Sequence, residues 1–147
     1  MTGYAGTMMN PLENIPDGSD PAELATWLFD LARAGETDHL AAYVDAGAPI
    51  NMRNQNGDTL IMLAAYNGHE DTVRALLERG GDPNLTNERG QTPLAGAIFK
   101  KEDAVITALI EGGADLDHGT PSARQTAAMF GVDLPEASNP EADSPES

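Results

Sequence analysis

The stretch "GDTLIMLAAYNGHEDTVRALLERGGDPN", residues 57–84, decides the fold, because the chain nearly repeats it 33 residues later. The second version reads "GQTPLAGAIFKKEDAVITALIEGGADLD", residues 90–117. Three columns of residues keep the period of 33 over three copies without a gap: Thr26, Thr59 and Thr92; Ala32, Ala65 and Ile98; Gly47, Gly80 and Gly113. A fixed period of this length indicates one small unit that is stacked, rather than one large fold.

The unit in residues 57–84 is predicted to form two helices and a projecting turn. Thr59 is a good helix N-cap, and apolar residues follow it at helical spacing as far as Gly68. A second helix is expected to start around His69, with an acidic first turn, and to end at Gly80, which tolerates a left-handed backbone. The segment from Gly80 to Thr92 is rich in Gly, Pro, Asn and Asp, which is typical of turns.

Both ends of the array depart from this unit. At the start, Asp20 is expected to cap a helix that begins well before Thr26. At the end, Ser122 takes the place of Thr92 only when three residues are removed from the preceding turn, and no second helix of full length is expected after Gly131. Terminal units that lose a turn or a helix are what a stacked array needs to close its ends.

The two quoted stretches resemble the ankyrin-repeat family, whose pattern is Gly-x-Thr-Pro-Leu-His-x-Ala-Ala, then Gly-His, then Leu-Leu, then Gly-Ala-Asp-x-Asn. The resemblance covers roughly residues 21–132, and the layout is similar to small stand-alone bacterial ankyrin-repeat proteins. It implies an all-α fold, a solenoid of stacked helix-turn-helix units with short projecting hairpin turns and atypical capping repeats. Two motif positions differ: Met62 and Ala95 replace the first histidine, and Lys101-Glu102 replaces the Gly-His pair in the second stretch.

The period and the composition together predict the domain organisation. The two ends are rich in Pro, Ser, Asn, Gly and acidic residues, a mixture that buries too little apolar surface to order itself. We expect these segments, in chain order: a disordered arm 1–19, an ankyrin-repeat domain 20–132 made of an N-cap repeat 20–53, repeats 54–86 and 87–119 and a C-cap half repeat 120–132, and an acidic disordered tail 133–147.

Charge and composition narrow the possible partners. The chain of 147 residues has 24 acidic and 8 basic side chains, a net charge of −16, which disfavours nucleic acid and anionic lipid as partners. The absence of cysteine excludes disulfides and thiolate metal sites and fits a reducing compartment. No stretch has the pattern of a signal peptide or a membrane span. We therefore expect a cytoplasmic protein that binds neither membranes nor nucleic acid.

The family resemblance implies a concave surface, formed by the inner helices and the hairpin tips, that binds another protein. Carried over by column, it predicts these partner-binding residues: Arg33, Tyr66, Asn67, Arg89, Phe99, Lys100 and Phe130. Tyr66 and Phe99 stand one period apart, so stacking is expected to make them neighbours on one surface, and exposed aromatic pairs are frequent binding hot spots. The alternative, that these rings fill gaps between adjacent helices, stays open. The hairpin tips add candidates for a polar rim, which could equally be ordinary solvated turn residues: Gln55, Asn56, Asp58, Glu88, Arg89 and Gln91.

The chain offers little to an enzyme. His39, His69 and His118 lie on different units, and none pairs with another at metal-ligand spacing. There is no phosphate-binding loop, nucleophile elbow or cysteine nucleophile. We predict no catalytic residue, metal, cofactor or small-molecule substrate. The leading hypothesis is a non-catalytic adaptor or regulator that binds a protein of unknown identity; the alternative is an acidic inhibitor or decoy that covers a basic surface mainly by charge. A small hydrolase is disfavoured.

Overall fold

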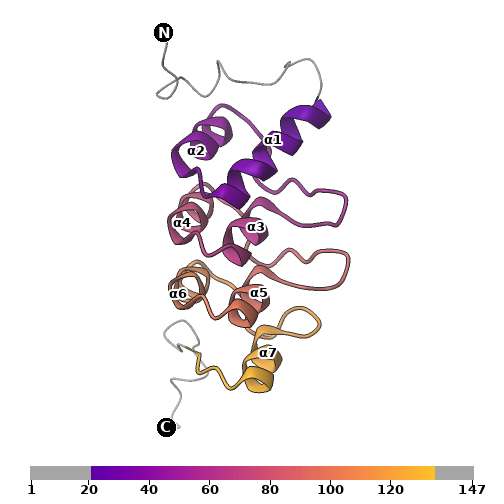
Figure 1. The fold of residues 1–147 in the computed structure, drawn as a ribbon, viewed down its shortest axis with the longest axis vertical. Coiled ribbons are helices and arrows are strands. Elements are labelled where there is room, and N and C mark those ends of the chain that lie inside the picture. The colour runs from indigo at the N-terminus through magenta and orange to yellow at the C-terminus, as the bar shows by residue number, and fades with distance from the viewer. Residues whose placement is uncertain (1–20, 135–147) are drawn as a thin grey trace.

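A computed structural model describes residues 21–134, and in this part the chain forms seven α-helices. They are α1 Pro21–Ala34, α2 Thr37–Asp45, α3 Leu60–Tyr66, α4 Glu70–Glu78, α5 Pro93–Lys100, α6 Asp103–Glu111 and α7 Ala123–Phe130. Figure 1 shows α2, α4 and α6 stacked in one column, the outer helices, and α1, α3, α5 and α7 in a second, the inner helices. The loops between repeats project on the other side of the inner helices (Figure 1). The predicted all-α solenoid is confirmed.

The inner helices begin where the sequence predicts. The side-chain oxygens of Thr59, Thr92 and Ser122 each accept a hydrogen bond from the backbone N–H three residues on, at 3.1 Å in every case. At α7 the Gln125 side chain also accepts from the Ser122 N–H at 2.8 Å, which completes a capping box. Each such cap stabilises a helix by about 1 kcal/mol. The three-residue shift that aligns Ser122 with Thr92 is therefore confirmed, whereas the predicted cap Asp20 lies outside the described residues.

The hairpin turns are built alike and are linked to one another. In the first hairpin turn (residues 53–59), Asn54 Oδ1 accepts from the N–H groups of residues 56 and 58. In the second (residues 86–92), Asn87 Oδ1 accepts from those of residues 89 and 91. The two turns meet where the Glu88 N–H donates to the Asn56 carbonyl at 3.0 Å. Arg53 and Thr59 form the isolated β-bridge of the described residues.

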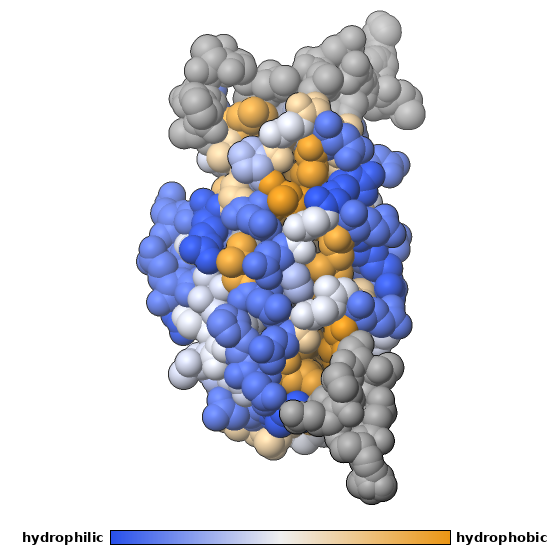
Figure 2. Space-filling model, turned by 180° about the vertical axis from the view of Figure 1, so that it is seen from behind, coloured by the Kyte–Doolittle hydropathy of each residue, from blue (hydrophilic) through white to orange (hydrophobic). Residues whose placement is uncertain are grey.

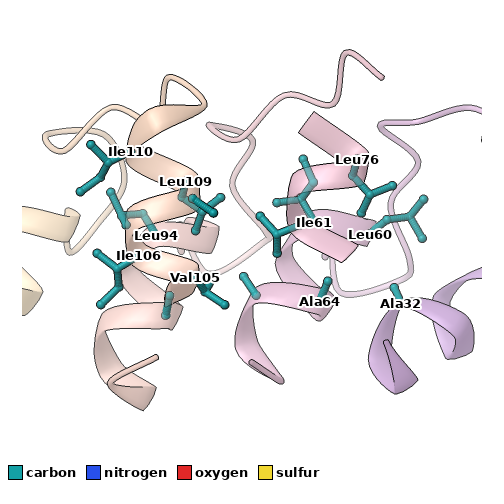
Figure 3. Packing of buried hydrophobic residues seen from close by; sticks show 14 of the residues in the cluster. Ala32, Leu60, Ile61, Ala64, Leu76, Leu94, Val105, Ile106, Leu109 and Ile110 are labelled. Carbon is teal, nitrogen blue, oxygen red and sulfur yellow. The ribbon is translucent and has the colours of Figure 1, made fainter. Parts of the chain in front are cut away.

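The core is aliphatic and runs through the whole stack. Leu60, Ile61, Leu94 and Leu109 are fully buried, and small residues such as Ala64 allow the helices to approach closely. Figure 3 shows that these side chains come from successive repeats and point into the layers between them. Inner helices pack on neighbouring inner helices and outer helices on outer ones, so each repeat is stabilised mainly by its neighbours.

Asparagine side chains join successive repeats at the ends of the outer helices. Asn51 Oδ1 accepts from the Asp82 N–H at 2.9 Å, and Asn84 Oδ1 accepts from the Asp115 N–H at 2.7 Å. The next residue of this column is Asp117, and its carboxylate instead accepts from Arg124 Nε at 2.8 Å. That hydrogen bond holds the pKa of Asp117 below its usual value.

The C-terminal boundary differs from the prediction in one detail. Val132 and Leu134 both pack against the core cluster, although the predicted acidic tail begins at residue 133. The predicted boundary lies where the acidic residues begin, at Asp133. Because apolar Leu134 packs against the core, the folded part extends at least to residue 134. The rest of the predicted tail and the predicted arm 1–19 lie outside the described residues.

Candidate functional site

A groove of about 460 Å³ lies between the inner helices and the hairpin turns. Small residues of α5, Ala95 and Gly96, are part of its lining. Polar lining comes from the hairpin turns and apolar lining from the last turns of the inner helices. The polar side includes Asn56, Asp58, Asn87, Arg89 and Gln91, and the apolar side includes Tyr66, Phe99, Met129 and Phe130.

The apolar side of this groove is unusually exposed for large side chains. Tyr66 is 43% exposed, Phe99 51%, Met129 63% and Phe130 42%, and these four are the exposed large hydrophobic residues of residues 21–134. The face seen in Figure 2 is mainly hydrophilic, with apolar patches along its long axis. The exposed large apolar side chains are therefore gathered in one place, as expected of a contact surface.

Tyr66 and Phe99 each lean onto the following repeat. Gly96 gives Tyr66 room, since a Cβ on that glycine would lie 3.3 Å from Tyr66 Cδ1. The Lys100 ammonium then lies 4.9 Å from the centroid of the Tyr66 ring, within the range of a cation–π interaction. Phe99 meets Phe130 edge to face, with ring centroids 5.4 Å apart. Both rings thus pack between repeats and remain about half exposed.

Tyr66 and Phe99 lie on one surface, as expected, and each ring is also contacted diagonally by the following repeat. The two rings line the same groove, but the side chain that faces each ring comes from the position after its own column in the next repeat: Lys100 for Tyr66, and Phe130 for Phe99. Helical side chains lean along the helix rather than standing straight out from it, so the nearest neighbour across a helix pair is displaced by about one residue. Sequence columns alone do not include this displacement.

The structure brings together four of the seven predicted site residues. Tyr66, Arg89, Phe99 and Phe130 line the groove, and Lys100 lies beside it on the Tyr66 ring. The other two predicted residues, Arg33 and Asn67, do not line the groove and make contacts within their own helices.

Arg33 and Asn67 serve the ends of helices. Arg33 pairs with Asp30 one turn earlier, at 2.8 Å between Nη1 and Oδ1. Asn67 is the C-cap of α3, and its Nδ2 donates to the Leu63 carbonyl at 2.8 Å. Both side chains are therefore already bonded to groups of their own helix.

Met129 also lines the groove; the column comparison places it with Phe130 on the last exposed turn of the fourth inner helix, although it is not among the seven predicted binding residues. The shift that aligns Ser122 with Thr92 also aligns Met129 with Phe99, so it belongs to the same column as Tyr66 and Phe99. Phe130 then falls in the column of Lys100, which explains why each of them covers the ring of the preceding repeat.

Ion pairs of the described residues lie mainly away from the groove. Arg74 bonds both Glu70 and Glu111, at 2.8 and 3.0 Å, and these hydrogen bonds raise the pKa of Arg74 above its usual value. Arg79 pairs with Asp45 of the preceding repeat at 2.9 Å. Within residues 21–134, no group of three or more His, Asp or Glu side chains is arranged to hold a metal ion, and no helix is long and apolar enough to cross a membrane.

Comparison with known proteins agrees with this geometry. A family model described as ankyrin repeats, in three copies, matches residues 28–120. The ankyrin repeat protein PA3287 of Pseudomonas aeruginosa is 49% identical over 47 residues, which is 32% of this chain. The matched stretch spans only 28% of that protein's length.

Proposed function

Because the chain belongs to the ankyrin-repeat family, we propose that it is a non-catalytic adaptor or regulator that holds a partner protein in the groove described above. Ankyrin repeats are in general protein–protein interaction modules. The proposal goes further in naming the surface: the last turns of α3, α5 and α7 together with the first two hairpin turns.

The observation that carries the proposal is the cluster of Tyr66, Phe99, Met129 and Phe130, which are 42–63% exposed around one groove. Leaving large apolar side chains in water loses about 25 cal/mol for each Å² that burial would remove from solvent. Aromatic side chains contribute much contact area for little loss of conformational freedom, and they are enriched among binding hot spots. A partner that covers these four side chains recovers that free energy.

The polar side of the groove is suited to orient such a partner. Asn87 Nδ2 donates to Asp58 Oδ1 at 2.9 Å and to Gln91 Oε1 at 2.8 Å, so the first two hairpin turns present a preordered edge. Preordered polar groups at a rim contribute specificity at little entropic cost. The partner is therefore expected to dock with its apolar side chains toward the helix ends.

A capture experiment with matched variants tests the groove. The full chain and its Tyr66→Ala/Phe99→Ala variant are used as bait in a native lysate, together with a control variant, Glu78→Ala/Asp103→Ala, that changes exposed residues of the outer helices α4 and α6. We expect proteins captured by the native chain and by the control to be lost with the groove variant. Circular dichroism melts check that all three are folded, and equal capture by all three would refute the proposal.

Salt dependence separates this function from the acidic inhibitor or decoy. Exposed charges are screened over about 10 Å at 0.1 M salt, so a complex formed mainly by charge should dissociate as salt rises to about 0.5 M. A groove complex formed mainly by apolar burial should largely persist. Capture that disappears at high salt and ignores the Tyr66→Ala/Phe99→Ala change would favour the decoy instead.

A further inference from the structure

We propose that the segment held in the groove is an acidic, apolar peptide stretch of a partner protein, with large apolar side chains against the aromatic residues and a carboxylate beside Arg89 and Lys100. This inference rests on the proposed function and specifies the chemistry of the partner. It follows from the distribution of the basic residues, which is uneven.

Half of the eight basic residues are neutralised by the chain itself. Arg33, Arg74, Arg79 and Arg124 each have a nitrogen within 3.0 Å of a carboxylate oxygen. Within residues 21–134, no ion pair of 4.0 Å or less involves the other four, which are Arg53, Arg89, Lys100 and Lys101. Carboxylates are plentiful in a chain with a net charge of −16, so a basic side chain without a carboxylate partner is a candidate for binding an acidic group of another molecule.

Two of these four unpaired cations are at the groove. Arg89 lines it from the second hairpin turn, and Lys100 lies over Tyr66, which lines it from α3. The groove therefore offers two positive charges that no carboxylate of residues 21–134 neutralises, next to exposed aromatic side chains. A positive edge beside an apolar surface is complementary to apolar residues that are followed or preceded by Asp or Glu.

The groove's own carboxylate is bonded by an asparagine of the hairpin turn rather than paired with Arg89. The backbone N–H of Arg89 donates to Asn87 Oδ1 at 2.9 Å, which fixes the turn. The same Asn87 side chain donates to Asp58 Oδ1 at 2.9 Å, and Asp58 is the one acidic residue in the groove lining that the structure describes. Asp58 is thus engaged by an amide, and the Arg89 guanidinium is left for a carboxylate from outside, to which it can donate two parallel hydrogen bonds.

The experiment selects peptides from a random 12-residue display library on the immobilised full chain. Three variants are selected in parallel. The groove-charge variant is Arg89→Glu/Lys100→Glu; its control, Arg53→Glu/Lys101→Glu, makes the same change in net charge with residues outside the groove lining. The groove-apolar variant is Tyr66→Ala/Phe99→Ala/Phe130→Ala.

The native chain and the control are expected to enrich peptides that combine large apolar residues with Asp or Glu, the acidic residues about threefold over the unselected library, as suits exposed ion pairs. The groove-charge variant should enrich Lys and Arg instead, and the groove-apolar variant should enrich neither set. If the charge reversal unfolds the chain, Arg89→Gln/Lys100→Gln replaces it, and the acidic preference should then disappear without reversal.

Each failure has its own signature. Peptides that require Tyr66, Phe99 and Phe130 but show no acidic preference would overturn this inference and leave the proposed function intact. An enriched set that none of the variants alters, or no enrichment at all, would overturn both. Residues 1–20 have three acidic and no basic residues. If a synthetic peptide of this sequence bound the native chain but not the groove-charge variant, the groove would belong to the chain's own arm, and the partner proposed here would be wrong.

Discussion

The turns that join the two helices of the second and third repeats occupy the same place in the array but are held differently. In the second repeat Gly68 has φ +78°, and the ring of His69 reaches back so that its Nε2 lies 2.8 Å from the Arg33 carbonyl oxygen of the first repeat. In the third repeat Lys101 takes the left-handed conformation at φ +59°, and Glu102 follows it. The comparison shows one geometry that glycine adopts without cost and one that a lysine is forced to adopt.

The neighbours of the two turns differ as well. A Cβ on Gly35 would lie 2.5 Å from His69 Nδ1, and one on Gly68 would lie 2.8 Å from the Glu102 carboxylate carbon. His69 and Glu102 therefore cover the preceding turn in the same way. Of these two side chains only His69 makes a hydrogen bond across the turn within the described residues, because its ring N–H donates to a carbonyl oxygen, whereas a carboxylate can only accept. The apolar columns hold the third repeat in register without that bond.

Filling the space under His69 should have the largest effect. Gly35→Ala places a methyl group against the ring, at a backbone φ of +74°, and should lower the free energy of unfolding by about 3 kcal/mol. Gly131→Ala is the matched control, because φ is +68° there and the space beside it is open, so it should lose only about 1–2 kcal/mol. Urea denaturation measures both. Equal losses would mean that His69 does not lock the turn.

The second-largest effect is expected from removing the side chain that covers each turn, and the loss of stability should differ between the two repeats. His69→Ala deletes the hydrogen bond to the Arg33 carbonyl and should destabilise the chain by about 1 kcal/mol. Glu102→Ala deletes a side chain without a hydrogen bond to the described residues and should change stability by less than about 0.5 kcal/mol. Urea denaturation at constant pH compares the two variants, and a larger loss for Glu102→Ala would contradict this view of the turns.

Replacing Lys101 of the third repeat by glycine, the residue at the corresponding position of the second repeat, should stabilise the chain slightly. Lys101→Gly relieves the left-handed strain of a residue with a Cβ, although the unfolded chain gains freedom, so the net increase should be about 0.5–1 kcal/mol. The denaturation midpoint measures the gain. Lys101→Ala serves as the control and should show no such gain, since alanine keeps the Cβ that causes the strain.

The smallest effect concerns the asparagine column that ends in Asp117. Arg124 holds the pKa of this carboxyl below its usual value of about 3.9, so its contribution to stability is present at neutral pH and is lost as the pH falls below that value. Asp117→Asn should therefore lower Tm slightly at pH 7 and not at about pH 2, where native and variant should coincide. As a control, Asn84→Asp places a carboxyl in the same column without Arg124 beside it. A Tm difference between the native chain and Asp117→Asn that persists in acid would refute the role of the Arg124 pair.

Most of the fold could be predicted from the sequence because its determinants are local. Thr59, Thr92 and Ser122 are caps whose hydrogen bonds reach only three residues along the chain, and the period of the apolar columns fixes which faces are buried. The departure at Leu134 comes from packing of one apolar residue beyond an acidic one, which a boundary drawn by charge does not detect.

The candidate site was predictable only in part, for a physical reason. Column comparison indicates which side chains leave the helix on the groove side, and it identified Tyr66, Phe99 and Phe130. It does not include interactions inside one helix, which occupy Arg33 and Asn67, nor the lean of side chains that pairs Phe99 with Phe130. Those features depend on the packing of neighbouring helices, which the spacing of residues does not specify.

The last inner helix has a consequence for how the groove behaves over time. Within the described residues α7 is supported chiefly by α5, whereas α3 and α5 are each flanked by inner helices on both sides. In a stack stabilised by adjacent contacts, the terminal member opens first and most often. Because α7 carries Met129 and Phe130, that opening would widen the groove at the α7 end only, while the side formed by α3 and α5 stays in place. Among the inner helices, amide hydrogen exchange should be fastest in α7, and it should slow once a ligand contacts both α7 and the neighbouring inner helices.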